Sequence, residues 1–156
     1  MAKIVLSELD EYSRIAVPFI LARFPEWKPF ASPTPRPDGL GATVNFNVPC
    51  PSPHVESGLW VSTDDEELSV GFHTHHSHFT DYDDRTNFRQ IEAGLEQAAA
   101  YLEDRSGVVS WYEGDRMVGS TSADLPLDGP LPRIFSDDFG SRGTLRSWSG
   151  KFDRDG

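Results

Sequence analysis

Short runs with a two-residue hydrophobic period alternate in this chain with two longer runs of helical period, and this order most constrains its fold. A period of two is typical of a strand with one buried face, and a period near 3.6 is typical of an amphipathic helix. The order is helix, three strands, helix, then two or three strands. It predicts an α+β fold: a mainly antiparallel sheet of five to six strands with two main helices packed on one face. The expected strands are residues 43–48, 59–63, 68–78, 108–112, 116–120 and 144–149.

Two segments have helical periodicity. The first is expected over residues 8–24, with Ser7 as its N-cap and a bend at Pro18. The second begins near Phe88, with Thr86 or Asp84 as its cap, and it ends before Gly107. Its apolar stripe consists of Phe88, Ile91, Leu95, Ala98, Ala99 and Leu102.

The remaining segments are rich in Pro, Gly, Ser and Asp. Residues 29–39 and 121–143 are expected to be loops for this reason. With 156 residues, the chain is long enough to bury one core, so we expect a single domain over residues 1–156.

Four of the five histidines lie between residues 73 and 78. If the preceding alternation continues as one strand, His76 and His78 share the face of Leu68 and Val70, and His73 and His75 point to the other face. Four imidazoles on two faces cannot converge on one ion without a bulge.

A metal site is the alternative interpretation of this cluster. His73 and His75 could bind a divalent ion together with Asp81 or Asp83, and the ion would activate water for hydrolysis. However, the sequence contains no HExxH, no CxxC and no deaminase-type motif. We therefore favour a solvated or interface-lining strand, with no metal and no cofactor.

The chain is strongly acidic. Its 25 acidic residues against 14 basic ones give a formal net charge of −11 and a pI near 4.7. Such a surface repels nucleic acid and anionic membranes, so neither is an expected partner, whereas a basic protein is. The acids cluster at residues 64–67, 81–84 and 137–138, among others.

Two further features bear on the compartment and on catalysis. The N-terminal apolar run is too short for a secretory signal or a membrane span, and the single Cys50 cannot form an intramolecular disulfide, so we expect a cytoplasmic protein. Cys50 lies between prolines and is interpreted as a turn residue rather than a nucleophile. Nucleophile-elbow, Walker A and dinucleotide-binding motifs are all missing, so no catalytic residue is assigned.

The aromatic residues of the expected strands are Trp60, Trp111, Tyr112 and Trp148. Most of them should lie in the core, because aromatic side chains dominate cores. One or two that are exposed beside the acidic clusters would be anchors for a protein partner.

Several short patches in a fixed order carry a resemblance. They are Gly58-Leu59-Trp60-Val61-Ser62-Thr63, Val70-Gly71-Phe72, His76-Ser77-His78-Phe79, Ser110-Trp111-Tyr112-Glu113-Gly114-Asp115, Val118-Gly119-Ser120 and Arg146-Ser147-Trp148-Ser149-Gly150-Lys151-Phe152-Asp153. Over residues 58–153 this pattern resembles small bacterial immunity proteins encoded beside polymorphic toxins of the Rhs and contact-dependent type. The resemblance implies a cytosolic, non-catalytic protein that binds one toxin domain and blocks it.

The leading hypothesis is therefore a binding module that neutralises a cognate toxin domain, which would be a nuclease, a deaminase or an ADP-ribosyltransferase. Its acidic surface would occupy the basic cleft of the toxin, with carboxylates in place of substrate phosphates. The alternative is the metal-dependent hydrolase that uses the histidine cluster. The expected partner-binding residues are Asp64, Asp65, Glu66, Glu67, His73, His75, Asp81, Asp83 and Asp84.

Overall fold

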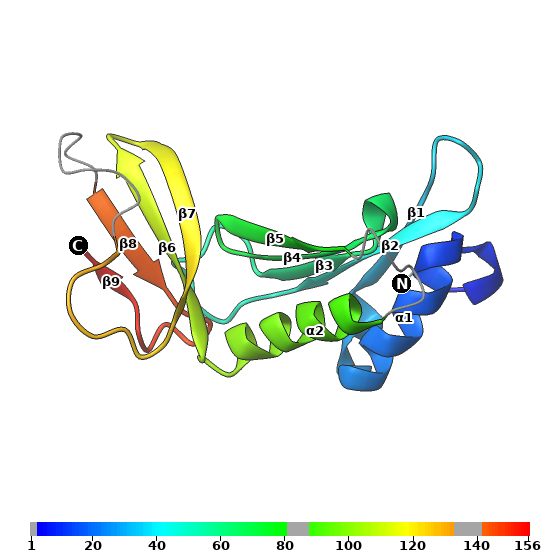
Figure 1. The fold of residues 1–156 in the computed structure, drawn as a ribbon, viewed down its shortest axis with the longest axis horizontal. Coiled ribbons are helices and arrows are strands. Elements are labelled where there is room, and N and C mark those ends of the chain that lie inside the picture. Colours follow the sequence, from blue (N-terminus) through cyan, green and yellow to red (C-terminus); the bar gives the residue numbers. More distant parts are fainter. Residues whose placement is uncertain (1–2, 81–87, 133–141) are drawn as a thin grey trace. The chain divides into compact units, whose positions relative to one another are not determined.

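The structure, a computed structural model, describes residues 3–80, 88–132 and 142–156. Its elements confirm the α+β class with antiparallel sheets, but the described strands form two sheets, of five and four strands, rather than one (Figure 1). The chain divides into two compact units. The first contains Met1–Val48, Leu59–Gly71 and His76–Ala98, and the second contains Pro49–Gly58, Phe72–His75 and Ala99–Gly156.

The first unit contains most of the larger sheet, whose strand order is β1-β2-β3-β4-β5. The strands are β1 (Ala31–Pro35), β2 (Ala42–Val48), β3 (Leu59–Ser62), β4 (Leu68–Phe72) and β5 (His75–Phe79). Helix α1 (Glu11–Arg23) and the first part of α2 (Arg89–Leu102) also belong to this unit, with the short 3-10 helices η1 (Leu6–Glu8), η2 (Pro25–Phe30) and η3 (Asp64–Glu66).

Both helices lie on the same face of this sheet. Val61 of β3 is paired with Val70 of β4, and both side chains are buried, so alternate residues on either side of them share that face. Helix α1 reaches this face through the Ser13 hydroxyl, which lies 2.6 Å from the hydroxyl of Thr63. Helix α2 reaches it at Gly94, where an added Cβ would lie 2.6 Å from a methyl group of Leu68.

The core of the first unit follows from this arrangement. Helix α1 buries Ala16, Val17 and Ile20, and α2 buries Ile91 and Leu95 against the sheet. The largest fully buried side chains of the strands and of η2 complete this core: Trp27, Val44, Phe46, Leu59, Val61, Leu68 and Val70.

The second unit contains a four-stranded antiparallel sheet of order β7-β6-β8-β9. Its strands are β6 (Ser106–Glu113), β7 (Arg116–Asp124), β8 (Arg142–Arg146) and β9 (Arg154–Asp155). Val109, Trp111 and Leu145 form its buried centre, and Leu125, Leu127 and Leu131 pack against them. Strand β6 is central, because β7 and β8 pair with its two edges.

Several expected boundaries are wrong. Residues 31–35 form β1 rather than loop, because this strand pairs on one side only and therefore tolerates Pro33 and Pro35. Strand β7 extends to Asp124, into the region expected to be loop. The last long strand covers Arg142–Arg146 instead of 144–149.

The caps of the two helices also differ from expectation or cannot be placed. Asp10, not Ser7, caps α1, since its carboxylate accepts a hydrogen bond of 2.7 Å from the backbone N–H of Ser13. The expected caps of α2, Asp84 and Thr86, lie outside the described residues.

The largest correction concerns the histidine segment, which is a hairpin and not one strand. Strand β4 ends at Phe72 and β5 begins at His75. His73 between them has a φ of 55°, a left-handed conformation that a continuous strand cannot contain. The turn resets the alternation, so the faces expected for the histidines relative to Leu68 and Val70 are wrong.

Candidate protein-docking face

The candidate site lies on the face of the larger sheet opposite the two helices, which we call the outer face. Trp60 and Ser62 alternate with the buried Leu59 and Val61 along β3, so they lie on this face. The register pairs Trp60 with Gly71 and Ser62 with Ser69. The described residues that line this part of the outer face are Trp60, Ser62, Ser69, Gly71, His76 and His78.

Three aromatic rings form a row on the outer face. The centroid of the Trp60 indole lies 5.8 Å from that of His76, and His76 lies edge-on to His78 at 5.0 Å. Gly71 makes room for this row, because a Cβ there would lie only 2.0 Å from Cε2 of Trp60. The indole therefore lies directly over the backbone of β4, against Gly71.

His78 joins this aromatic row to the acidic residues. Its Nδ1 lies 2.5 Å from Oε1 of Glu67 and 2.9 Å from the hydroxyl of Ser69. A Ser-His-Glu group can be a nucleophilic triad, but there the hydroxyl and the carboxylate contact different ring nitrogens. Here both contact Nδ1, so the arrangement orients the imidazole and does not activate Ser69.

The acidic turn, which we define as Asp64–Glu67, follows β3 directly. Asp64, Asp65 and Glu66 are exposed, whereas the side chain of Glu67 is only 15% exposed beside His78. Asp65 and Glu66 have φ angles of 56° and 58°. Within the described residues, no basic side chain forms an ion pair with Asp64 or Asp65, so their charges face solvent.

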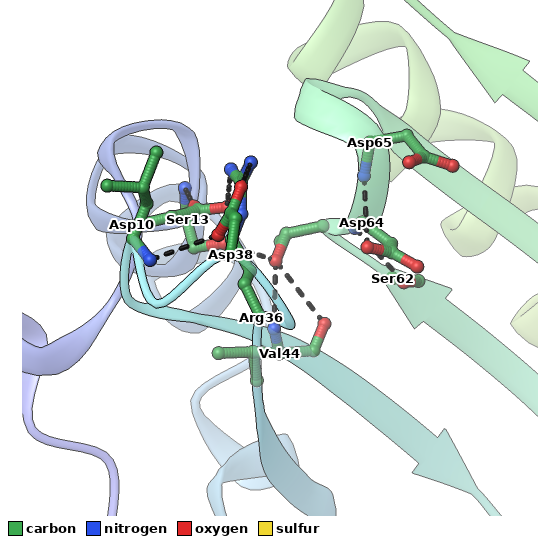
Figure 2. Close-up of polar contacts among 10 residues, drawn as sticks. Asp10, Ser13, Arg36, Asp38, Val44, Ser62, Asp64 and Asp65 are labelled. Carbon is green, nitrogen blue, oxygen red and sulfur yellow. Dashed lines mark hydrogen bonds and ion pairs between the residues drawn. The ribbon is translucent and has the colours of Figure 1, made fainter.

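A network of buried hydroxyl groups holds the acidic turn in place. The Thr63 hydroxyl accepts a hydrogen bond of 2.9 Å from the backbone N–H of Val44 and lies 2.6 Å from the hydroxyl of Ser13. The backbone N–H of Thr63 donates to the carbonyl of Val44 at 3.0 Å. Within the turn, the N–H of Asp64 donates to Ser62 Oγ and the N–H of Asp65 donates to the Asp64 carboxylate (Figure 2).

A second group of acids lies at the start of α1. Asp10 is only 2% exposed, and its Oδ2 lies 3.1 Å from the Arg36 guanidinium, which also pairs with Asp38 at 2.5 Å (Figure 2). The guanidinium lowers the pKa of the Asp38 carboxyl. Burial raises the pKa of Tyr12, and the negative charges of Glu67 and Asp10 raise it further. The phenol of Tyr12 is thus influenced by a carboxylate from each of the two groups of acids.

Six of the nine expected partner-binding residues lie in the described part of the chain, and the structure places them in two separate groups. Asp64, Asp65, Glu66 and Glu67 form the acidic turn. His73 is 7% exposed and lies in the β4–β5 turn, and the half-buried His75 has its Nδ1 3.0 Å from the hydroxyl of Ser120. Asp81, Asp83 and Asp84 lie outside the described residues.

The histidines that share the outer face with Glu67 are His76 and His78, and sequence reasoning did not assign them to the site. The left-handed turn at His73 places His76 and His78 on this face. No Gly, Asn or Pro marks that turn, so the sequence contains no signal for it.

The expected ligands for a metal ion do not converge within the described parts of the chain. In residues 3–80, 88–132 and 142–156, no three His, Cys, Asp or Glu side chains are placed so that they could hold an ion. The proposed carboxylate ligands Asp81 and Asp83 belong to the segment that is not described. Nothing observed therefore favours the hydrolase alternative over the binding hypothesis.

Cys50 has the surroundings of a structural thiol. Its Sγ–H donates to the carbonyl oxygen of Trp148 at 3.2 Å. Burial raises the pKa of this thiol, and the charges of Asp153 and Asp104 act in the same direction. A raised pKa keeps the sulfur protonated, which is the opposite of what a nucleophile needs.

Comparisons of this chain with protein-family models, with curated proteins and with solved structures find no match. Among the described residues, no helix combines the length and the apolar character needed to cross a membrane.

Proposed function

We propose that this protein is an immunity protein, which binds a cognate bacterial toxin domain in the cytoplasm and neutralises it. The observation that carries the proposal is the juxtaposition of two features on the outer face: exposed carboxylates at the acidic turn and a row of aromatic rings beside them. Protein interfaces commonly combine an aromatic anchor with charged groups at the rim.

The chemistry of the acidic turn fits a basic partner. Asp64 and Asp65 extend into solvent from a turn that hydrogen bonds fix to β2 and α1, so their charges are pre-positioned. A toxin that acts on nucleic acid or on a nucleotide presents Arg and Lys to phosphate groups, and carboxylates can take the place of those phosphates. The formal net charge of −11 adds long-range attraction to such a cleft and repels nucleic acid.

The first experiment identifies the partner. The tagged protein is incubated with lysate of its source bacterium, and bound proteins are identified by mass spectrometry. The proposal predicts one stoichiometric partner that matches the C-terminal domain of a large secreted protein. Expression of that domain should arrest growth of a laboratory bacterium, and co-expression of this chain should restore growth. A partner whose expression is harmless would overturn the immunity function.

The second experiment tests the acidic turn with matched variants. Asp64→Asn with Asp65→Asn removes two charges, keeps the oxygen that accepts the Asp65 N–H, and suits the left-handed φ of residue 65. Asp115→Asn with Asp128→Asn removes two exposed charges from the second unit and is the control.

At low salt, the variant with Asp64→Asn and Asp65→Asn should associate with the captured toxin domain about threefold to tenfold more slowly than the control variant. At high salt, the two association rates should become equal. Equal association rates for the two pairs at low salt would refute the role of the acidic turn.

A further inference from the structure

A buried histidine holds a long loop in the second unit. The loop Pro49–Gly58, which we call the proline loop, contains Pro49, Pro51 and Pro53. The backbone N–H of His73 donates to the carbonyl of Ser57 at 2.9 Å, and the backbone N–H of Glu56 donates to Nδ1 of His73, also at 2.9 Å. At its other end, the loop is held by the hydrogen bond from Cys50 to the Trp148 carbonyl.

The Glu56 contact requires one protonation state of His73. Nδ1 can accept the Glu56 N–H only while it carries no proton, so the imidazole is neutral with its hydrogen on Nε2. That Nε2 is buried and has no hydrogen-bond partner among the described residues. A second proton could only go to Nδ1, where it would face the Glu56 N–H, replace an attraction with a repulsion, and leave a charge in a site that is 7% exposed.

The charged groups near His73 do not remove this penalty. Glu56 of the loop and Asp153 favour the imidazolium, and Arg146 of β8 opposes it, but burial is the largest effect, and the pKa of His73 is lowered. The Oδ1 of Asp153 already accepts from the N–H and hydroxyl of Ser147, and Arg146 pairs with Asp155 at 2.8 Å. Within the described residues, none of these groups forms an ion pair with His73.

We propose that the proline loop is an acid-sensitive latch: a proton from solvent that binds Nδ1 of His73 breaks the Glu56 contact and frees the part of the loop around Glu56. The freed Glu56 amide then exchanges its hydrogen faster with solvent. The inference rests on the geometry of the turn and the loop, and it does not depend on the immunity function.

The principal test is hydrogen exchange of the Glu56 amide in the intact chain, corrected for the intrinsic effect of pH. The protection factor should fall at least about tenfold from about pH 7.5 to about pH 5, whereas amides of the central strand β6 should stay protected. Because the pKa of His73 is lowered, its ring signal in the NMR spectrum should titrate below the ordinary range of a histidine. Unchanged protection of Glu56 after His73 has titrated would overturn the proposal.

A matched variant distinguishes the effect of protonating His73 from other effects of acid on the protein. In His73→Asn, the side-chain oxygen stands where Nδ1 was, accepts the Glu56 N–H, and does not titrate; Asn also suits a φ of 55°. This variant should retain protection at both pH values. His54→Asn changes the exposed histidine of the same loop and should behave like the unchanged protein. An equal loss of protection in the His73→Asn variant would show that another group is responsible.

Discussion

At the scale of single residues, Asp10 has two roles at the start of α1. It is almost fully buried, caps the helix through Ser13, and pairs with Arg36. These tasks can be separated, because asparagine is as good an N-cap as aspartate but carries no charge.

Asp10→Ala should therefore lower the free energy of unfolding by about 1–2 kcal/mol through the lost cap, and Asp10→Asn should recover most of that loss. Urea unfolding followed by circular dichroism measures both variants. Asp38→Ala is the control, because this exposed acid pairs with the same Arg36 and does not cap α1. If asparagine were as damaging as alanine, the ion pair rather than the cap would account for the role of Asp10.

Tyr12 gives a pH dependence with a defined sign. Burial and two nearby carboxylates raise the pKa of its phenol, so the folded chain keeps a proton that the unfolded chain loses above about pH 10. The associated stability is present below that pH and is lost as the pH rises further. Tyr12→Phe should thus reduce the alkaline loss of unfolding free energy between about pH 9.5 and 11.5. Parallel curves for the two proteins would contradict this assignment.

Some of this residue-scale detail could be expected from the sequence. The exposed acids of residues 64–66 and the grouping of His76 with His78 followed from composition and local alternation. The contact of His78 with Glu67 could not be expected, because it depends on the turn at His73. No residue type in that turn indicates its positive φ.

At the scale of elements, the hydroxyl of Thr63 connects β2, β3 and α1. It satisfies the buried N–H of Val44 and contacts Ser13. The hydroxyl oxygen of Thr63 thus holds the end of β3 against β2 and α1 within the core.

Thr63→Val keeps the shape of this side chain and removes its hydroxyl, so the Val44 N–H would remain buried without an acceptor. We expect a loss of about 1–3 kcal/mol in unfolding free energy. Thr63→Ser keeps the hydroxyl and should lose less, through one missing methyl group. Thermal and urea unfolding of both variants provide the measurement. A serine variant less stable than the valine variant would assign the effect to packing.

The helices and most strands were predictable as elements because their periodicity is local. The expected strand over residues 43–48 differs from β2 by one residue, and the stripe from Ile91 to Leu102 identifies α2. Strand β1 was missed because prolines are typical of loops. The histidine hairpin was missed because the two residues between β4 and β5, His73 and Thr74, include no Gly, Asn or Pro.

At the scale of the whole molecule, the surplus of acidic residues is the main electrostatic feature. Their mutual repulsion opposes the compact state, and salt screens it. The division into two sheets belongs to this scale as well. Pairing of β6 with β8 joins residues that are 30 to 38 positions apart in sequence, and local periodicity does not reveal such a partner.

We expect the melting temperature to rise by a few degrees between about 20 mM and 300 mM sodium chloride, as repulsion among the acids is screened. Replacement of exposed Asp115 and Asp128 by lysine should make this rise smaller, because it lowers the net negative charge. Scanning calorimetry at several salt concentrations measures both. A melting temperature that falls with salt would mean that favourable ion pairs outweigh repulsion.

The prolines of β1 have a consequence for assembly with other chains. The N–H of Arg36 donates toward the carbonyl of Gly41, so the nitrogens of Pro33 and Pro35, which alternate with it, point away from β2. The open border of the sheet therefore lacks two hydrogen-bond donors that an incoming strand would need. A strand from another molecule cannot add to this side in regular register, and the sheet is protected there from growth into fibrils.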